Sequence, residues 1–291
     1  MIYGFIREHA EYPAAKWARF YQVSNSGYYD YLRAKEARIE KETEYKIEIK
    51  RIFEASGGTY GPERICGVLR KSGHTASYRK VSGYMGELGL SSIHNRHRTR
   101  SLTDSRKARG EGYANLLRGN NYDLPRTAVS SDITYLKSGE GWLYLCTVKD
   151  IVSGEILGTS TSENMKKELA IRAFLNAQSR YGLGSGTIFH SDRGSQYTSN
   201  DFITTLAQYG VTQSFSRVGM PGDNAWSESF FATLKKECIH FRHFATRDEL
   251  RQAVFEWIEC FYNTRRVQER LGYMTPKEYA AYITETKRLA A

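Results

Sequence analysis

Three acidic residues occupy positions where a carboxylate could bind a metal ion. Asp132 lies inside the β-rich run VSSDITYL, where a carboxylate is costly unless it is paired or bound to a cation. Asp192 directly follows the short apolar run TIFH, and Glu228 lies in a helix expected soon after residue 222. Hard cations such as Mg²⁺ prefer oxygen ligands. Acids from two strands and one helix would hold two such ions, an arrangement that supports phosphodiester cleavage.

The same helix carries two candidate DNA-contacting side chains. Lys235 lies seven residues after Glu228, which at about 100° per residue returns it to the same helix face. Asn224 lies four residues before Glu228 and is expected on that face too. The ordinary alternative for each acid taken alone is a surface, capping or salt-bridged role, because most Asp and Glu side chains have one.

Composition indicates a folded protein with an anionic partner. The chain has 291 residues, of which 40% are hydrophobic and 13% aromatic, and its net charge is +10. These values argue against disorder, and the length predicts two domains. No apolar stretch reaches the ~18 residues of a membrane span or resembles a signal peptide. The four cysteines form no CxxC pair, so we expect reduced thiols and a cytoplasmic protein. The positive charge favours a polyanion such as nucleic acid.

The positive charge is concentrated in one part of the chain. Residues 64–118 hold 12 basic and 3 acidic side chains, a surplus of nine. Residues 96–122 are predicted to form a basic linker that neutralises DNA phosphates, and a solvated linker that is basic by chance is the alternative. The candidate DNA-binding residues in this linker are Arg96, Arg98, Arg100, Arg106, Lys107 and Arg109.

The residues before the linker are predicted to be helical. Positions 34–55 contain neither Pro nor Gly and are rich in Glu, Lys and Arg. A second helix begins near Pro62, and a third is capped by Ser77. We therefore expect an N-terminal helical segment over 1–36 and a helix-turn-helix-like domain over 37–95. DNA contact is favoured for the latter over simple helix packing, although nothing in it shows which bases would be read.

The residues after the linker predict an α/β core with a mixed sheet flanked by helices. Short β-rich runs and helical stretches alternate in the order βββαβαβ between residues 129 and 215. We place this core at 123–245. A capping box of Thr246 and Glu249 then starts a helix with a regular apolar face, and a second cap at Thr275 starts the last one. Residues 246–291 are expected to pack on the core as C-terminal helices.

Five ordered motifs resemble one family of transposases. Asp132, Asp192 and Glu228, with 35 residues between the last two, form a D, D(35)E pattern. With its neighbouring motifs the chain is similar to the second-reading-frame transposases of the frameshifting bacterial insertion sequences, family three, in the retroviral-integrase superfamily. The motifs are DITY (132–135), HSDRGSQYTS (190–199), DNAWSESFFATLKKE (223–237), YNTRRVQERLGYMTP (262–276) and TYGPERI (59–65).

The resemblance implies a fold, a reaction and partners. It implies an RNase H-like core in which Asp132, Asp192 and Glu228 are catalytic and bind two Mg²⁺ (or Mn²⁺) ions, and in which Lys235 contacts the end of the element. Such enzymes cut one strand at the element's terminus and use the exposed 3′-hydroxyl to attack another phosphodiester. The resemblance also implies terminal inverted repeats and target DNA as partners, a frameshift fusion with the upstream-frame product, a homo-oligomer on DNA, and a nucleoid-associated location.

Two departures and several alternatives remain at this point. Many relatives have Trp where this chain has Val129, and His where it has Gln268. A zinc site of Cys238, His240, His243 and Cys260 is disfavoured, because the set lacks the paired short spacings of structural zinc ligands. The alternative functions are a non-catalytic DNA-binding regulator, an inactive half of a fusion transposase, and a general nuclease of the RNase H type.

Overall fold

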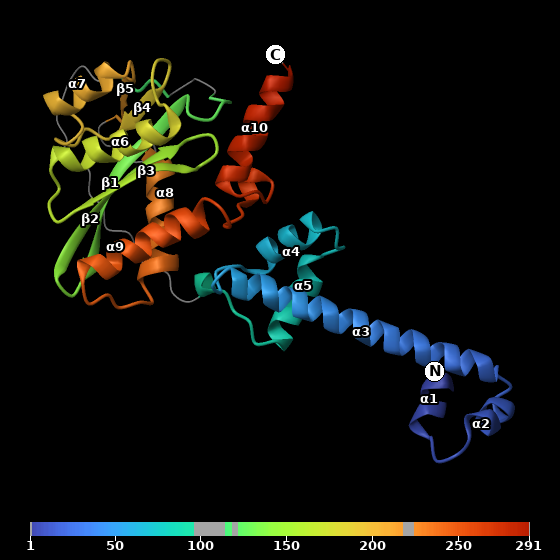
Figure 1. Ribbon diagram of the computed structural model, residues 1–291. Coiled ribbons are helices and arrows are strands. Elements are labelled where there is room, and N and C mark those ends of the chain that lie inside the picture. Colours follow the sequence, from blue (N-terminus) through green and yellow to red (C-terminus); the bar gives the residue numbers. More distant parts are fainter. Residues whose placement is uncertain (1, 96–113, 118–121, 218–223, 291) are drawn as a thin grey trace.

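The computed structural model describes residues 2–95, 114–117, 122–217 and 224–290. A long helix joins a small helical tip to a helical domain, which packs against an α/β core (Figure 1). Within the described ranges, no helix is long and apolar enough to cross a membrane. The basic residues 96, 98, 100, 106, 107 and 109 lie outside these ranges.

The N-terminal region is built on one continuous helix. Helices α1 (Ile2–Glu8) and α2 (Ala14–Phe20) precede α3 (Asn25–Ala55), whose 31 residues extend about 46 Å. Ser24 caps α3 by accepting a hydrogen bond from the backbone N–H of Gly27. The segment expected over 1–36 and the domain expected over 37–95 therefore share this helix, and α1 and α2 lie at its far end (Figure 1).

The predicted helix-turn-helix pattern is present after α3. Helix α4 (Pro62–Lys71) begins at the proline, and α5 (Tyr78–Glu87) is capped by Ser77. A short helix, η1 (Ile93–Asn95), follows. The C-terminal half of α3 packs on α4 and α5 around a buried cluster that includes Ile49, Ile65, Leu69 and Val81.

The core contains a five-stranded mixed sheet. Its strands are β1 (Ala128–Ser138), β2 (Gly141–Asp150), β3 (Ile156–Ser162), β4 (Ile188–Ser191) and β5 (Thr212–Phe215), in the spatial order β3-β2-β1-β4-β5. Neighbours among β1, β2 and β3 are antiparallel, whereas β1, β4 and β5 are parallel. With α6 (Lys167–Tyr181) and α7 (Asn200–Gln208), this confirms the predicted order βββαβαβ.

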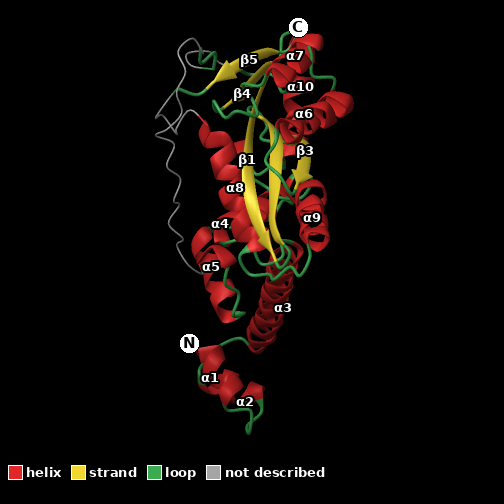
Figure 2. Ribbon diagram, turned by 90° about the vertical axis from the view of Figure 1, so that its left-hand side faces the viewer, coloured by secondary structure: helices red, strands yellow, loops and turns green. Residues whose placement is uncertain are grey.

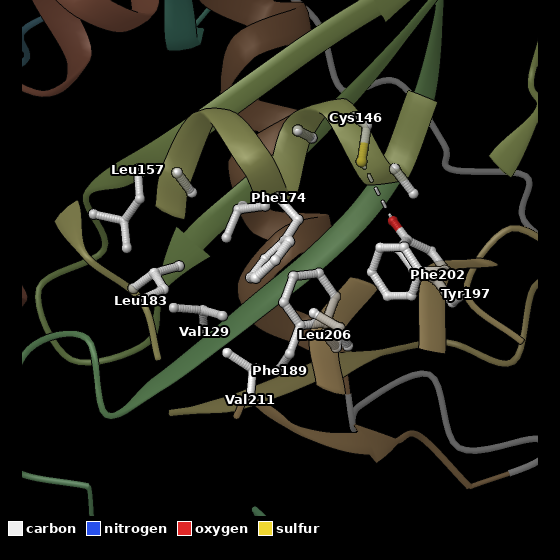
Figure 3. Close-up of a cluster of buried hydrophobic side chains, with 14 of the residues drawn as sticks. Val129, Cys146, Leu157, Phe174, Leu183, Phe189, Tyr197, Phe202, Leu206 and Val211 are labelled. Carbon is white, nitrogen blue, oxygen red and sulfur yellow. Dashed lines mark hydrogen bonds between the residues drawn. The ribbon is translucent and has the colours of Figure 1, made fainter. Parts of the chain in front are cut away.

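Two hydrophobic clusters lie on opposite faces of the sheet. Successive side chains of a strand point to opposite faces, so Val129 joins the cluster under α6 and α7, whereas Leu136 joins the cluster under α8 (Ala225–Leu234) and α9 (Arg247–Glu256). Figure 2 shows α6 and α8 on either side of the sheet. In Figure 3, Phe174 and Phe189 fill the first cluster, at whose edge the Tyr197 hydroxyl lies 3.5 Å from Cys146 Sγ.

The C-terminal helices begin where the capping boxes predict. Thr246 and Glu249 form the capping box of α9, and Thr275 and Glu278 exchange the same pair of hydrogen bonds at the start of α10 (Pro276–Ala290). The short helix η5 (Glu269–Leu271) precedes α10. Helices α8 and α9 continue as the π-helical turns η3 (Lys235–Ile239) and η4 (Trp257–Tyr262), which the sequence did not predict.

A buried ion pair of the core also contacts the helical domain through His94. The Glu237 carboxylate, fully buried in η3 directly after α8, accepts hydrogen bonds from the Arg266 guanidinium, the shortest 2.8 Å. His94 Nε2 lies 2.7 Å from the same carboxylate. Burial would raise the pKa of Glu237, but its hydrogen bonds to His94 and Arg266 hold that pKa below its usual value. The helical domain is thus connected to the helix that carries Glu228.

Arg266→Met should destabilise the protein by about 3–5 kcal/mol, because it leaves the Glu237 carboxylate buried without its guanidinium partner. Arg180→Met, which breaks the more exposed pair with Glu259, should cost less than about 1 kcal/mol. Urea denaturation of both variants measures the difference. Equal losses would contradict the larger stabilising role of the buried pair.

Candidate active site

The pairing register of β1 and β4 brings two of the predicted acids together. The last paired residues of these parallel strands are Ser130 and His190. Asp132 and Asp192 each lie two residues farther along, so they continue the same register. Adjacent strands are about 4.8 Å apart. The two carboxylates therefore lie next to each other where β4 ends.

Electrostatics support this proximity. Burial and the neighbouring charges of Asp192 and Glu228 raise the pKa of Asp132, whereas a hydrogen bond from the Ile133 N–H and the charge of Lys235 lower it, and the net result is a pKa of about 7. Asp192 is exposed to solvent as a residue, but partial burial of its carboxyl group raises the pKa of that group. Both carboxyl groups thus lie where their negative charge is poorly compensated by the protein.

Local backbone structure orients Asp192. Its Oδ1 accepts a hydrogen bond of 2.9 Å from the backbone N–H of Gly194, in the turn that follows β4. A Cβ atom at position 194 would lie 3.0 Å from that same Oδ1 and 2.9 Å from Gln196 Oε1. Glycine therefore leaves room for the carboxylate to fold back over its own turn.

Glu228 lies in the first turn of α8, which is tied to the sheet by two hydrogen bonds. Ser227 Oγ donates to Ser130 Oγ over 3.2 Å, and Lys149 Nζ donates to the backbone oxygen of Trp226 over 2.7 Å. Ser130 and Asp132 point to the same face of β1 because they are two residues apart. The start of α8 is therefore held over the face that carries Asp132, with the Glu228 side chain exposed to solvent.

The donor set fits a hard divalent cation, although the described residues form no ready-made metal site. No three His, Cys, Asp or Glu side chains in these parts of the chain are grouped closely enough to hold a metal. The three acids offer oxygen donors, and neither Asp132 nor Asp192 has an ion pair with a basic side chain among the described residues. In this setting, two adjacent carboxyl groups can both be fully ionised only when a cation lies beside them.

The structure places the two predicted DNA-contacting residues of α8 differently. Burial lowers the pKa of Lys235, and the charge of Asp132 raises it to a smaller extent. This effect of Asp132 indicates that Lys235 lies near the acids. Asn224 is buried, and its Oδ1 has no hydrogen-bond partner among the described residues. Helix α8 begins only at the next residue, so the helical spacing that placed Asn224 beside Glu228 does not apply.

The remaining sequence alternatives lie away from the acids. Val129 is fully buried in the cluster under α6, so it occupies a core position. Cys238 is buried and Cys260 exposed, and with His240 and His243 they form no metal-binding group in the described structure.

Lys149 is a functional candidate that the sequence analysis missed. It is buried in β2 opposite Ser130, and its ammonium group lies 5.8 Å from the centre of the Phe230 ring. Burial and the charges of Arg270 and Arg266 together lower the pKa of Lys149 to about 7. The alternation of side chains along β2 could have indicated this burial, because Lys149 lies on the same inward face as Leu143, Leu145 and Thr147.

Comparisons with known proteins define the class of the chain. Residues 123–221 and 228–282 match models of the integrase core domain, and residues 40–98 match an HTH-like domain. Together with the mixed sheet, these matches define an integrase-core transferase of RNase H-like fold that carries a DNA-binding helical domain.

Curated relatives define the family. The chain is 37% identical to the transposase for insertion sequence element IS904 of Lactococcus lactis, over 86% of this chain and 98% of that protein. It is 34% identical to transposase InsF for insertion sequence IS3A of Escherichia coli, over the full length of both. The chain belongs to the IS3 family of insertion-sequence transposases. Among solved structures, the catalytic core of BIV integrase matches 56% of this chain and 99% of that chain at 17% identity, with a TM-score of 0.43.

Lys149→Met should change how stability depends on pH. The pKa of Lys149 is lower in the folded state, so between pH 7 and 10 unfolding takes up a proton and the wild type gains stability as the pH rises. The variant lacks this gain, so its stability relative to the wild type should fall by about 2 kcal/mol between pH 7 and pH 9.

Urea denaturation at both pH values measures this change, and Lys166→Met, at an exposed lysine of the same core, is the control. A pH dependence shared by all three proteins would contradict a buried Lys149 ammonium group.

Proposed function

We propose that Asp132, Asp192 and Glu228 form the metal-binding catalytic centre with which this transposase cuts and joins DNA. The observation that carries the proposal is the β1–β4 register, which sets Asp132 beside Asp192 on the face to which α8 is tied. The three carboxylates would hold Mg²⁺ or Mn²⁺, as two ions. Bound there, the ions would activate the attacking oxygen and stabilise the leaving oxygen of the phosphodiester.

The protein's own groups have complementary tasks in this proposal. Asp132 and Asp192 supply adjacent carboxylates from a rigid sheet, and Glu228 supplies the third from the start of α8. Lys235, at the other end of α8, would bind a phosphate of the element end, because it is the basic side chain whose charge acts on Asp132. The reaction would cut one strand at the element's end and join the new 3′-hydroxyl to target DNA.

We also propose the finer organisation that the family resemblance implies. The segments 1–36, 37–95, 96–122, 123–245 and 246–291 act as an N-terminal segment, a helix-turn-helix-like domain, a basic linker, a catalytic core and C-terminal helices. The linker arginines and lysine bind DNA phosphates, and Asn224 contributes at the start of α8. The chain acts on the nucleoid as a homo-oligomer, fused by frameshifting to the upstream-frame product. An overlapping upstream frame with a slippery heptamer beside the gene is the observation that tests the fusion.

Asp132→Asn, Asp192→Asn and Glu228→Gln should each reduce Mg²⁺-dependent strand cleavage by more than about a hundredfold, because a metal ion supplies several kcal/mol of transition-state stabilisation. Cleavage of labelled element-end DNA measures this loss, with Asp201→Asn, an exposed acid of α7, as the active control. Full activity in any of the three variants would refute the assignment. Cleavage irrespective of element ends would favour a general nuclease, and binding without cleavage by the wild type would favour the regulator.

Stability distinguishes a metal ligand from a structural acid. In EDTA at pH 8, Asp132→Asn should be at least as stable as the wild type, because it removes repulsion from Asp192. Added Mg²⁺ or Mn²⁺ should raise the thermal midpoint of the wild type and leave that of the variant unchanged. A variant that is unstable in EDTA would instead indicate a structural role for Asp132.

A further inference from the structure

The β1–β2 hairpin extends beyond the end of β4 and carries exposed aromatic side chains. Strand β4 ends at Ser191, opposite the middle of β1, whereas β1 continues to Ser138. On this extension, Tyr135 is 52% exposed and Trp142 47% exposed. Their ring centres are 5.1 Å apart and the rings are nearly perpendicular, at 87°. About half of the surface of each of these two residues therefore faces solvent.

Register explains why the two rings meet. Tyr135 pairs with Tyr144, and Trp142 pairs with Lys137, so Tyr135 and Trp142 are diagonal neighbours on one face of the hairpin. This is the face that α6 and α7 cover nearer the start of β1, where Val129 is buried. The exposed rings thus continue the face beyond the end of that cluster.

The rings lie beside positive charge and close to the acids. Lys235 Nζ is 5.1 Å from the centre of the Tyr135 ring, and the charges of Lys235 and Asp132 act on each other. Asp132 and Tyr135 point to opposite faces of β1, and Lys235 interacts with both. Lys137, on the same face as Tyr135, is exposed. Cations and half-exposed aromatic side chains therefore occur together at one end of the site.

This combination matches the chemistry of an unpaired nucleotide. Proteins bind single strands with basic groups for the phosphates and aromatic rings on which bases stack. Tyr135 lies three strand residues from Asp132, about 10 Å along β1. A paired duplex hides the faces of its bases in the stack, so only unpaired bases could use the rings. The two lysines favour a nucleic acid over a neutral protein surface.

We propose that Tyr135 and Trp142 form a stacking surface for unpaired bases next to the phosphodiester held at Asp132. This inference rests on the proposed function and adds to it the form of DNA that the enzyme prefers, an end with opened bases. The stacking surface keeps the strand from re-pairing while Lys235 holds a phosphate.

The test compares DNA duplexes of one sequence with a blunt end or with three unpaired terminal nucleotides that carry 2-aminopurine. The full-length wild type should bind the unpaired end more tightly and change the 2-aminopurine fluorescence. The double variant Tyr135→Leu/Trp142→Leu should lose about 5- to 150-fold of this affinity per stacked base. Its affinity for the blunt duplex should stay within about twofold.

The control is Tyr135→Phe/Trp142→Phe, which keeps the ring faces and should keep the preference for the unpaired end. The leucine pair keeps apolar contact across the hairpin, and circular dichroism verifies its fold. No preference in the wild type, or an undiminished preference in the leucine variant, would overturn the proposal. A changed sedimentation coefficient in the leucine variant, with unchanged DNA binding, would overturn it in favour of an interface between copies.

Cleavage assays in Mg²⁺ separate this proposal from the proposed function. If Asp132→Asn still cleaves, the catalytic assignment fails whatever the stacking surface does. If cleavage requires Asp132 but the leucine variant cleaves blunt and unpaired ends in the wild-type ratio, only the stacking surface fails. Loss of the preference for unpaired ends in the leucine variant, with cleavage of unpaired ends reduced toward that of blunt ends, supports both.

Discussion

The parallel register between β1 and β4 is the constraint on which the candidate site depends. It fixes Asp132 beside Asp192 with no basic ion-pair partner for either among the described residues, so the fold retains two like charges that repel each other. The surrounding structure withstands this repulsion because the strands are buried between two hydrophobic clusters. A protein selected for stability alone would place an asparagine at one of these positions, so the retained repulsion is consistent with a site built for cations.

Helix α8 is attached at both ends, which makes it the link between the parts of the protein. At its start, Lys149 and Ser130 tie the turn of Glu228 to the sheet. Past its end, Glu237 binds Arg266 of the C-terminal segment and His94 of the helical domain. The helical domain is therefore connected through Glu237 to the helix that carries one of the acids.

Sequence patterns predicted the features that depend on residues close together along the chain. Strand composition and turn residues gave the order of elements around Asp132 and Asp192, and the Thr–Glu pairs marked the starts of α9 and α10. Features set by tertiary contacts could not be read in this way. Helical spacing placed Asn224 on the face of Glu228, but the helix begins after it. The burial of Lys149 depends on a contact with Trp226, 77 residues away.

The acids of the candidate catalytic centre can come together only late in protein synthesis. Asp132 comes to Asp192 through β1–β4 pairs separated by 60 residues, and to the helix of Glu228 through a serine contact separated by 97. The helical domain, in contrast, closes its core largely from residues 45–90. Because contacts between distant residues must wait for both partners to leave the ribosome, a nascent chain acquires its helical domain well before its acids can meet. An unfinished chain could thus engage DNA through that domain while it was still unable to cut.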